Sequence, residues 1–508
     1  MRPRRITAAL LPALPALPVL AALTALVVGA GLTGCAQAPQ VDMPALPQAT
    51  AFKEAQSPWV VAGSEAPLAW DGWWKVYGDA ELDGLQQRLI DNSPDLAAAL
   101  ARYDQARAAT ETLRAAQSPT FNSSLNVQRD RQSELRPLRV LGPNSPDWYN
   151  SATLGLDASY ELDLWGRVRQ QVAAGVAAEQ AARADLAAAR LQLQAQLADS
   201  LVALRGLDRD DALLKEAEEA YARALDLIQR RHRAGIASGL DLARAQGQLE
   251  AAHSQRRQSQ AQRAVLEHAI AALVGANAST FSMEPKVMDL GIPVIPTGVP
   301  STLLQRRPDI AAAQRRVEAA TATLGVARTA YYPSFTLSAQ GGFQTSDLGR
   351  FVEAPNLFWA LGPTLAFNFF DGGRRKAEEA RATAALDETT QRYRSTALTA
   401  FQQVEDQLAL LDRYGQALEN ERANVAASDR SLALATNRYK AGAANYLEVV
   451  TSQTAGLTAK RSANDLATRQ QRASIQLIRA LGGGWEMVES NSHTSSSASL
   501  SQPRNSSN

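Results

Sequence analysis

Four segments of the chain alternate between apolar residues and small or polar residues. In the first segment, Leu125 and Val127 alternate with Asn126 and Gln128. This period-two pattern predicts strands with one apolar and one polar face, at about residues 120–131, 152–163, 334–345 and 356–370. Each is about ten to twelve residues or more, long enough for a tilted strand to cross a bilayer. Soluble β-hairpins packed on helices alternate in the same way, so the pattern alone leaves that alternative open.

Long helical stretches follow each predicted pair of strands. Residues 165–232 contain no proline and few glycines, and residues 374–440 have the same character. At 1.5 Å per residue, such a stretch forms a helix of about 100 Å. Gly235 and Gly442 predict turns, after which helices return over residues 240–274 and 446–481. Two antiparallel helices of this length predict hairpins that pack sideways against other hairpins, as in coiled coils.

The chain is a duplication of one unit. Pro94-Asp95-Leu96 matches Pro308-Asp309-Ile310 at a separation of 214 residues, and Gly166-Arg167 matches Gly373-Arg374 at 207 residues. The two copies are expected at 79–290 and 291–485. Because the offset falls from 214 to 207 residues, the second copy is expected to be shorter than the first by a few residues in the strand region. Ser93 before Pro94 predicts an N-cap for the first helix of the first copy.

The amino terminus predicts export. A basic start with Arg2, Arg4 and Arg5 precedes an apolar stretch, and the pattern closes with Leu32-Thr33-Gly34-Cys35. This indicates a signal peptide at 1–34. The tetrad resembles the bacterial lipobox, which implies that Cys35 is lipidated. In such lipoproteins an Asp after the cysteine favours retention in the inner membrane, so Ala36 at that position points to the outer membrane. A plain signal peptide with an incidental cysteine is the alternative. Residues 35–78 predict an extended linker, and the Ser/Asn-rich residues 486–508 a disordered tail.

Composition excludes several classes of function. The net charge is +1 with basic and acidic residues interspersed, which gives no support to a nucleic-acid partner. Cys35 is the one cysteine, and the four histidines, at 232, 253, 268 and 493, have no metal-ligand spacing. No nucleophile elbow or phosphate loop is present. We therefore expect no enzyme activity, no metal and no cofactor.

Four strands cannot close a barrel in lipid, where each unpaired backbone group costs several kcal/mol. The strands must therefore be shared between copies of the chain, which excludes a monomer. Two chains would give eight strands, whose interior is filled by side chains, whereas three would give twelve and leave a channel. This reasoning favours three copies over two without deciding between them.

Longer motifs carry a family resemblance. Leu303-Leu304-Gln305-Arg306-Arg307-Pro308-Asp309-Ile310 and Tyr160-Glu161-Leu162-Asp163-Leu164-Trp165-Gly166-Arg167 resemble the outer-membrane efflux proteins of the TolC/OprM type, and within them the NodT-like lipoproteins. The resemblance implies a mainly α fold with a membrane β-barrel: a homotrimer with a 12-strand barrel in outer-membrane lipid and a 12-helix periplasmic tube. It implies that the tips at Gly235 and Gly442 meet a periplasmic adaptor, a membrane fusion protein, which joins the duct to an inner-membrane RND-type pump.

The implied function is a passive outer-membrane exit duct for small toxic compounds or drugs. One alternative with the same fold is a channel for type I protein secretion. An alternative of another class is a structural lipoprotein that tethers the envelope and does not conduct.

The resemblance also implies a periplasmic gate near the tips. Glu448 and Thr451 occupy the positions that match the family's aperture acids. Tyr439 matches the tyrosine of its gating network, and Asp241 matches an acidic residue on the first hairpin. Repeated by symmetry, Glu448 would form an acidic ring that selects for cations. Ala444 stands where some members carry a bridging arginine, and Thr451 replaces a second acid, so the closing contacts must differ. The alternative is that Glu448 is an ordinary solvated carboxylate.

Basic residues cluster at two further places. Arg230, Arg231 and Arg233 lie near one tip, where they would meet an adaptor or anionic lipid, or simply face solvent. Arg374, Arg375 and Lys376 begin a helix, a position that disfavours cations, so lipid headgroups or acidic neighbours are expected to compensate. Asp163 and Asp371 precede the corresponding long helices and are expected to cap them.

Overall fold

The computed structural model describes residues 49–55, 60–62, 72–133, 148–288, 291–298, 300–302 and 306–483. The predicted signal peptide, Cys35, the predicted tail and residues 303–305 of the longest motif lie outside the described residues. The chain divides into two compact units. The described part of the first comprises residues 107–133, 148–178 and 317–389, and the second contains the other described residues.

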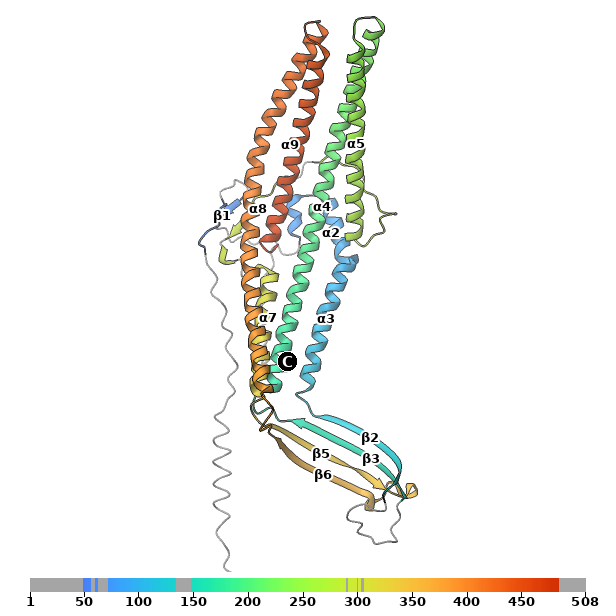
Figure 1. Ribbon diagram of the computed structural model, residues 1–508, viewed down its shortest axis with the longest axis vertical. Helices are drawn as coiled ribbons and strands as arrows, with labels where there is room; N and C mark the ends of the chain where they lie inside the picture. Colours follow the sequence, from blue (N-terminus) through green and yellow to red (C-terminus); the bar gives the residue numbers. More distant parts are fainter. Residues whose placement is uncertain are drawn as a thin grey trace, which may run out of the picture. The chain divides into compact units, whose positions relative to one another are not determined.

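The first unit holds an open antiparallel sheet. Its strands, in the order β2-β3-β5-β6, are β2 (Thr120–Arg131), β3 (Trp148–Glu161), β5 (Ser334–Thr345) and β6 (Leu357–Ala366) (Figure 1). Within the described residues, β2 and β6 each pair on one side only. Large apolar side chains are exposed on these outer strands, among them Phe121, Leu125, Trp359 and Leu361. The sheet thus leaves two strand edges and much apolar surface uncovered by its own chain.

Two strand ends differ from the sequence-based expectation. β3 begins at Trp148 rather than near residue 152, because its first residues pair with β2 beyond the end of β5. β6 ends at Ala366 although apolar alternation continues to residue 370. Ala366 pairs with Ser334, the first residue of β5, so the chain beyond it has no partner strand.

The two copies have almost the same dimensions. The first contains α3 (Pro94–Ala115), α4 (Arg167–Arg233) and α5 (Gly239–Leu273), and the second contains α7 (Pro308–Thr329), α8 (Arg374–Lys440) and α9 (Tyr446–Ala480). Corresponding helices have 22, 67 and 35 residues in both copies. The difference lies in the second strand of each pair, with 14 residues in β3 and 10 in β6. This accounts for part of the change of offset in the sequence.

The start of α3 differs from the prediction. Ser93 is the C-terminal cap residue of α2 (Ala80–Asn92), and its own N–H bonds to the Leu89 carbonyl. Its buried hydroxyl has no described hydrogen-bond partner, so the expected side-chain N-cap is absent. Two helices therefore meet at Ser93, and Pro94 begins the second of them without needing an amide hydrogen.

The main core lies in the second unit. Residues of η1 (Trp73–Tyr77) and α2 pack with α4, α5, α8 and α9, and Trp73 is only 1% exposed. The Tyr77 hydroxyl lies 2.8 Å from that of Ser474 on α9. Nearby, β1 (Val60–Ala62) pairs in parallel with β4 (Ile295–Gly298), which precedes the second copy. The last part of the predicted linker is therefore built into this core. Short helices η2 (Pro300–Thr302), η3 (Leu348–Arg350) and η4 (Ala354–Asn356) lie in other connections.

Ion pairs join the long helices of the second unit. Between α4 and α5, Arg263 binds Asp208 at 2.6 Å, and it also binds Glu267 on its own helix. Between α4 and α9, Arg461 binds Asp210 at 2.7 Å. These contacts tie α4 to α5 and α4 to α9, in addition to the apolar core that the helices share. No helix in the described part of the chain is both long enough and apolar enough to cross a membrane.

Candidate functional site at the hairpin tips

The two hairpins turn in the same way. Gly235 and Gly442 both have φ of 75°, a left-handed conformation that glycine adopts without strain. After each glycine, the next amide donates to a carbonyl five residues earlier, from Ile236 to Arg231 and from Ala443 to Arg438, both at 2.8 Å. This is the pattern of a Schellman motif. The turns predicted at these two glycines are therefore present, and they have matching backbone geometry.

Each returning helix begins with a side-chain cap. The Asp241 amide donates to the Ser238 hydroxyl at 3.1 Å, and that hydroxyl donates back to the Asp241 carboxylate at 2.9 Å. In the second hairpin, the Glu448 amide donates to the Asn445 side-chain oxygen at 3.1 Å. Asp241 and Glu448 thus occupy equivalent positions, three residues after a cap. The Asp241 carboxylate is used locally, whereas the Glu448 carboxylate is left for other contacts.

Glu448 forms an ion pair within its own hairpin. Its carboxylate lies 3.2 Å from the guanidinium of Arg438 on α8, and the two side chains are 43% and 60% exposed. Arg438 also donates to the Ala443 carbonyl of the turn, at 3.3 Å. The negative charge of Glu448 is therefore partly balanced by a cation that the sequence analysis did not single out.

Two tyrosines pack together where the hairpins meet. The rings of Tyr439 and Tyr446 have centroids 5.6 Å apart, and Tyr446 is only 3% exposed. Tyr446 belongs to a small apolar cluster with Ile228 of α4 and Ala245 of α5. Burial, reinforced by the nearby Tyr439, Tyr221 and Asp241, raises the pKa of Tyr446 to about 12. This cluster joins both hairpins near their tips.

A cation lies over one of these rings. The guanidinium carbon of Arg231 on α4 is 4.7 Å from the centroid of the Tyr439 ring on α8. This is within the range of cation–π attraction. Arg231 therefore binds one hairpin to the other, which the sequence analysis, treating it as part of an exposed basic run, did not predict.

Of the four predicted gate residues, Tyr439 takes part in this contact and Asp241 lies close enough to influence Tyr446. Glu448 is engaged with Arg438. Thr451 is exposed, and its hydroxyl donates to the Leu447 carbonyl of its own helix at 2.8 Å. The structure thus assigns Thr451 no described contact between the hairpins.

The model of the family described as "Outer membrane efflux protein" matches residues 85–276 and 299–483. The chain belongs to the outer membrane efflux protein family. It is similar to outer membrane protein OprJ of Pseudomonas aeruginosa, with 32% identity over 470 residues that cover 91% of this chain and 95% of OprJ. As a member of this family, it is an outer-membrane protein.

Two further relatives support the same assignment. The pyoverdine export outer membrane protein OpmQ of P. aeruginosa is 34% identical over 426 residues, covering 82% of this chain and 87% of OpmQ. The crystal structure of the Campylobacter jejuni CmeC outer membrane channel is similar with a TM-score of 0.85 and 25% identity, over 90% of this chain and 96% of CmeC. The mainly helical fold with four antiparallel strands is thus that of outer-membrane channels.

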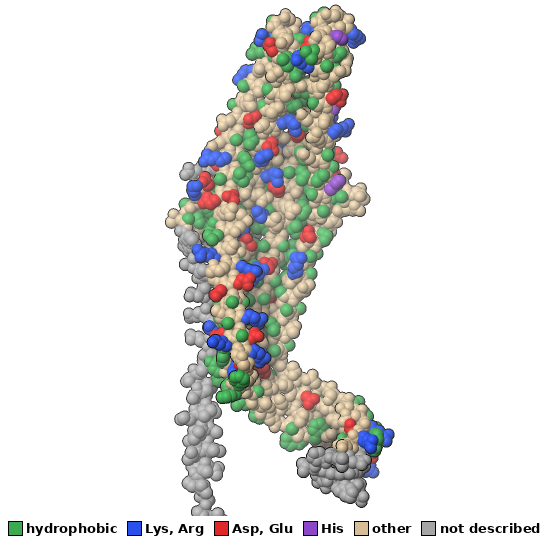
Figure 2. Space-filling model, in the orientation of Figure 1, with side chains coloured by type: hydrophobic (Ala, Val, Ile, Leu, Met, Phe, Trp, Pro, Cys, Tyr) green, Lys and Arg blue, Asp and Glu red, His purple; other side chains and the backbone are tan. Residues whose placement is uncertain are grey.

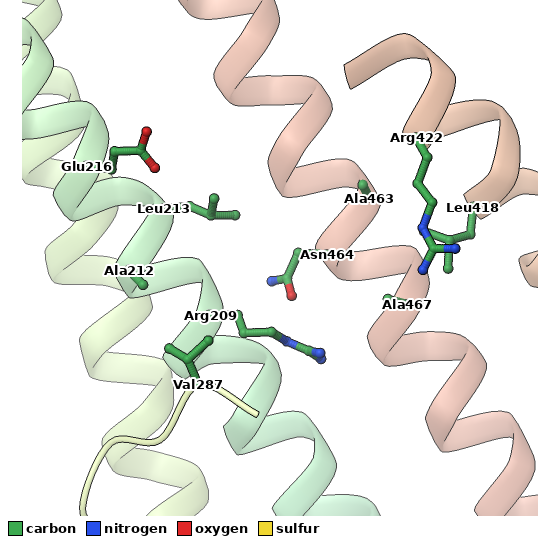
Figure 3. Close-up of a pocket in the computed structure, with 10 residues that line it drawn as sticks. All are labelled: Arg209, Ala212, Leu213, Glu216, Val287, Leu418, Arg422, Ala463, Asn464 and Ala467. Carbon is green, nitrogen blue, oxygen red and sulfur yellow. The ribbon is translucent and has the colours of Figure 1, made fainter. Parts of the chain in front are cut away.

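This efflux protein also has an open cavity of about 390 Å³ away from the tips (Figure 3). Arg209 and Glu216 of α4, Arg422 of α8 and Asn464 of α9 lie around it, with apolar side chains between them. Arg209 donates to Thr468 and Gln471 of α9, at 3.2 and 3.4 Å. None of the predicted site residues lines the cavity, and Arg209 ties α4 to α9 beside it.

Proposed function

We propose that three copies of this chain form a passive exit duct through the outer membrane. The observation that carries the proposal is the sheet β2-β3-β5-β6, which has two strand edges unpaired within the described residues and exposed apolar side chains on its outer strands. An open edge is tolerated in lipid only if another strand pairs with it. Three copies contribute twelve strands, enough to surround a channel.

The long hairpins extend the duct toward its partners in the periplasm. The turns at Gly235 and Gly442 meet a periplasmic adaptor, and exposed Ile236 and Leu240 beside the first turn offer it an apolar contact. The adaptor joins the duct to an inner-membrane RND-type pump, which supplies the energy. Relatives named for efflux and for pyoverdine export support small compounds as cargo.

Lipidation at Cys35 anchors the amino terminus in the same membrane. The support is the signal-like amino terminus that ends in Leu-Thr-Gly-Cys. Several acyl chains give a stable anchor because each buried methylene contributes about 0.8 kcal/mol. The anchor adds to the attachment that the sheet itself provides.

Planar-bilayer recording of the full-length purified protein tests the duct. We expect discrete channels whose activity migrates with a trimer in size-exclusion chromatography and crosslinking. A monomeric protein, or a trimer that never conducts even after its tip contacts are removed, contradicts the proposal and favours the tethering alternative.

A further inference from the structure

The two copies differ in charge where the strands meet the long helices. In the first copy, Arg167 at the start of α4 donates to Glu161, with 2.8 Å between Nε and Oε1. Arg169 is paired with Asp163 at 3.2 Å. Both arginines of the first junction therefore have an acidic partner.

The second junction lacks one of these acids. Arg374 corresponds to Arg167 at the offset of 207 residues, and the same offset places Asn368 where the first copy has Glu161. Asp371 is already occupied: it accepts from the amides of Gly373 and Arg375, and from the Arg375 guanidinium at 2.6 Å. Its use as a helix cap leaves no carboxylate for Arg374.

Two cations consequently stand without an ion pair. Arg374 and Lys376 are exposed and form no salt bridge with any residue that the structure describes. The acids that follow are engaged elsewhere, Glu378 with Arg381 at 3.0 Å and Glu379 with Arg328 at 3.1 Å. A helix start disfavours uncompensated cations, so an anion from outside the chain would stabilise this junction.

Apolar side chains border these cations. Phe369 is 90% exposed and Phe370 is 84% exposed, the largest values among the exposed apolar residues of the described chain. Leu164 and Tyr332 lie at the same end of the sheet and are also exposed. Figure 2 shows hydrophobic side chains beside Lys and Arg where the helices of the first unit meet its strands. Aromatic residues next to basic ones fit the boundary between acyl chains and headgroups.

From this asymmetry we infer that the second junction binds anionic phospholipid headgroups of the leaflet on the helical side. Arg374 and Lys376 bind the phosphate, while Phe369 and Phe370 enter the acyl region. The inference rests on the proposed placement of the sheet in the bilayer. It adds a preference for anionic lipid that the duct itself does not require. The preference is located in the second repeat of each chain and not in the first.

The test uses the full-length protein in membranes that contain equal amounts of phosphatidylcholine and phosphatidylglycerol. Lipid that remains bound after mild detergent extraction is identified by mass spectrometry. We expect the wild type to be enriched in phosphatidylglycerol, and Arg374→Gln with Lys376→Gln to reduce that enrichment on the order of tenfold, since each cation near an anionic surface contributes about 1 kcal/mol. Arg430→Gln with Lys440→Gln, which removes two exposed cations elsewhere on α8, is the matched control and keeps it.

A second variant tests whether an acid that pairs with Arg374 lowers the phosphatidylglycerol enrichment even when both cations are kept. Asn368→Glu supplies the acid of the first copy and leaves both cations in place, so the enrichment should fall again. Phe369→Ala with Phe370→Ala should reduce total bound lipid and keep the preference. A wild type without preference, or a preference that survives Arg374→Gln with Lys376→Gln or Asn368→Glu, overturns the inference.

Conductance recorded on the same preparations keeps the two proposals apart. Channels without lipid preference reject the headgroup site and leave the duct standing. Lipid preference in a protein that never conducts, even after its tip contacts are removed, rejects the duct and leaves the headgroup site standing.

Discussion

Arg231 on the first hairpin lies over the ring of Tyr439 on the second, with 4.7 Å between the guanidinium carbon and the ring centroid. The contact joins residues about two hundred positions apart and lies beside the apolar cluster that includes Tyr446. The guanidinium over the aromatic ring ties the two hairpins together near their tips.

Arg231→Gln should loosen the closed tips. Cation–π contacts contribute about 0.5–2 kcal/mol, so the ratio of open to closed channels should rise roughly two- to thirtyfold. Single-channel recording measures this ratio. Arg233→Gln removes a neighbouring exposed arginine without touching the tyrosine and is the control. Equal open probabilities in the two variants would show that the contact does not hold the tips.

Arg438→Gln should strengthen cation selectivity. The substitution leaves Glu448 without the cation that lies 3.2 Å from it, so a ring of Glu448 would act with its full charge. Glu448→Gln should have the opposite effect. Reversal potentials in asymmetric KCl measure both, and no shift in either variant would remove Glu448 from the conducting path.

High pH should loosen the tips through Tyr446. Its folded-state pKa is about 12, raised by burial from an ordinary value of 10.0. A raised pKa favours the neutral form in the folded state, so the stabilisation is complete below pH 10 and is lost as the pH rises toward 12. Tyr446→Phe keeps the packing and removes the titrating group. Difference absorbance at 295 nm should lack one late-titrating phenol in this variant; a loss below pH 10 instead would contradict the assignment.

Arg263→Met should destabilise the second unit. Asp208 has a side chain only 1% exposed and would lose one of its partners, Arg263 at 2.6 Å. Removing one member of a buried ion pair costs about 3–5 kcal/mol, although the remaining contact of Asp208 with Arg205 reduces that figure. Thermal unfolding should show a lower midpoint than in the exposed control Arg257→Gln. Equal midpoints would show that the pair adds little to stability.

Cys35→Ser should abolish acylation. Labelling of growing cells with radioactive palmitate should mark the wild type and not the variant, because serine cannot replace the thiol. The variant should still fractionate with the outer membrane, since the sheet remains. Label on both proteins would place the acyl chains elsewhere.

Much of the fold follows from local pattern. Period-two alternation located all four strands, and glycines placed both turns, because these signals depend on neighbouring residues. The end of β6 was misplaced because strand length is set by the partner, and Ser334 of β5 reaches no further than Ala366. Ser93 does precede α3, and its carbonyl accepts from the Ala97 amide at 3.0 Å, but its hydroxyl makes no cap, and the same residue also ends α2.

The candidate site was harder to predict. Tyr439 and Glu448 came from family resemblance, and the structure adds the partners Arg231, Arg438 and Tyr446. Arg231 stands in a run of basic residues that looks uniformly solvated in sequence. Which of these arginines contacts Tyr439 depends on how α4 packs against α8. That packing joins residues far apart in the sequence, so the pattern of neighbouring residues does not predict it.

The equal helix lengths of the two copies, set against Glu161 in one and Asn368 in the other, have an evolutionary consequence. The junction of one repeat can lose an acid without any change in the length of the helix that follows it. A duplicated scaffold can therefore differ in charge at one junction while the helices after both junctions keep the same length.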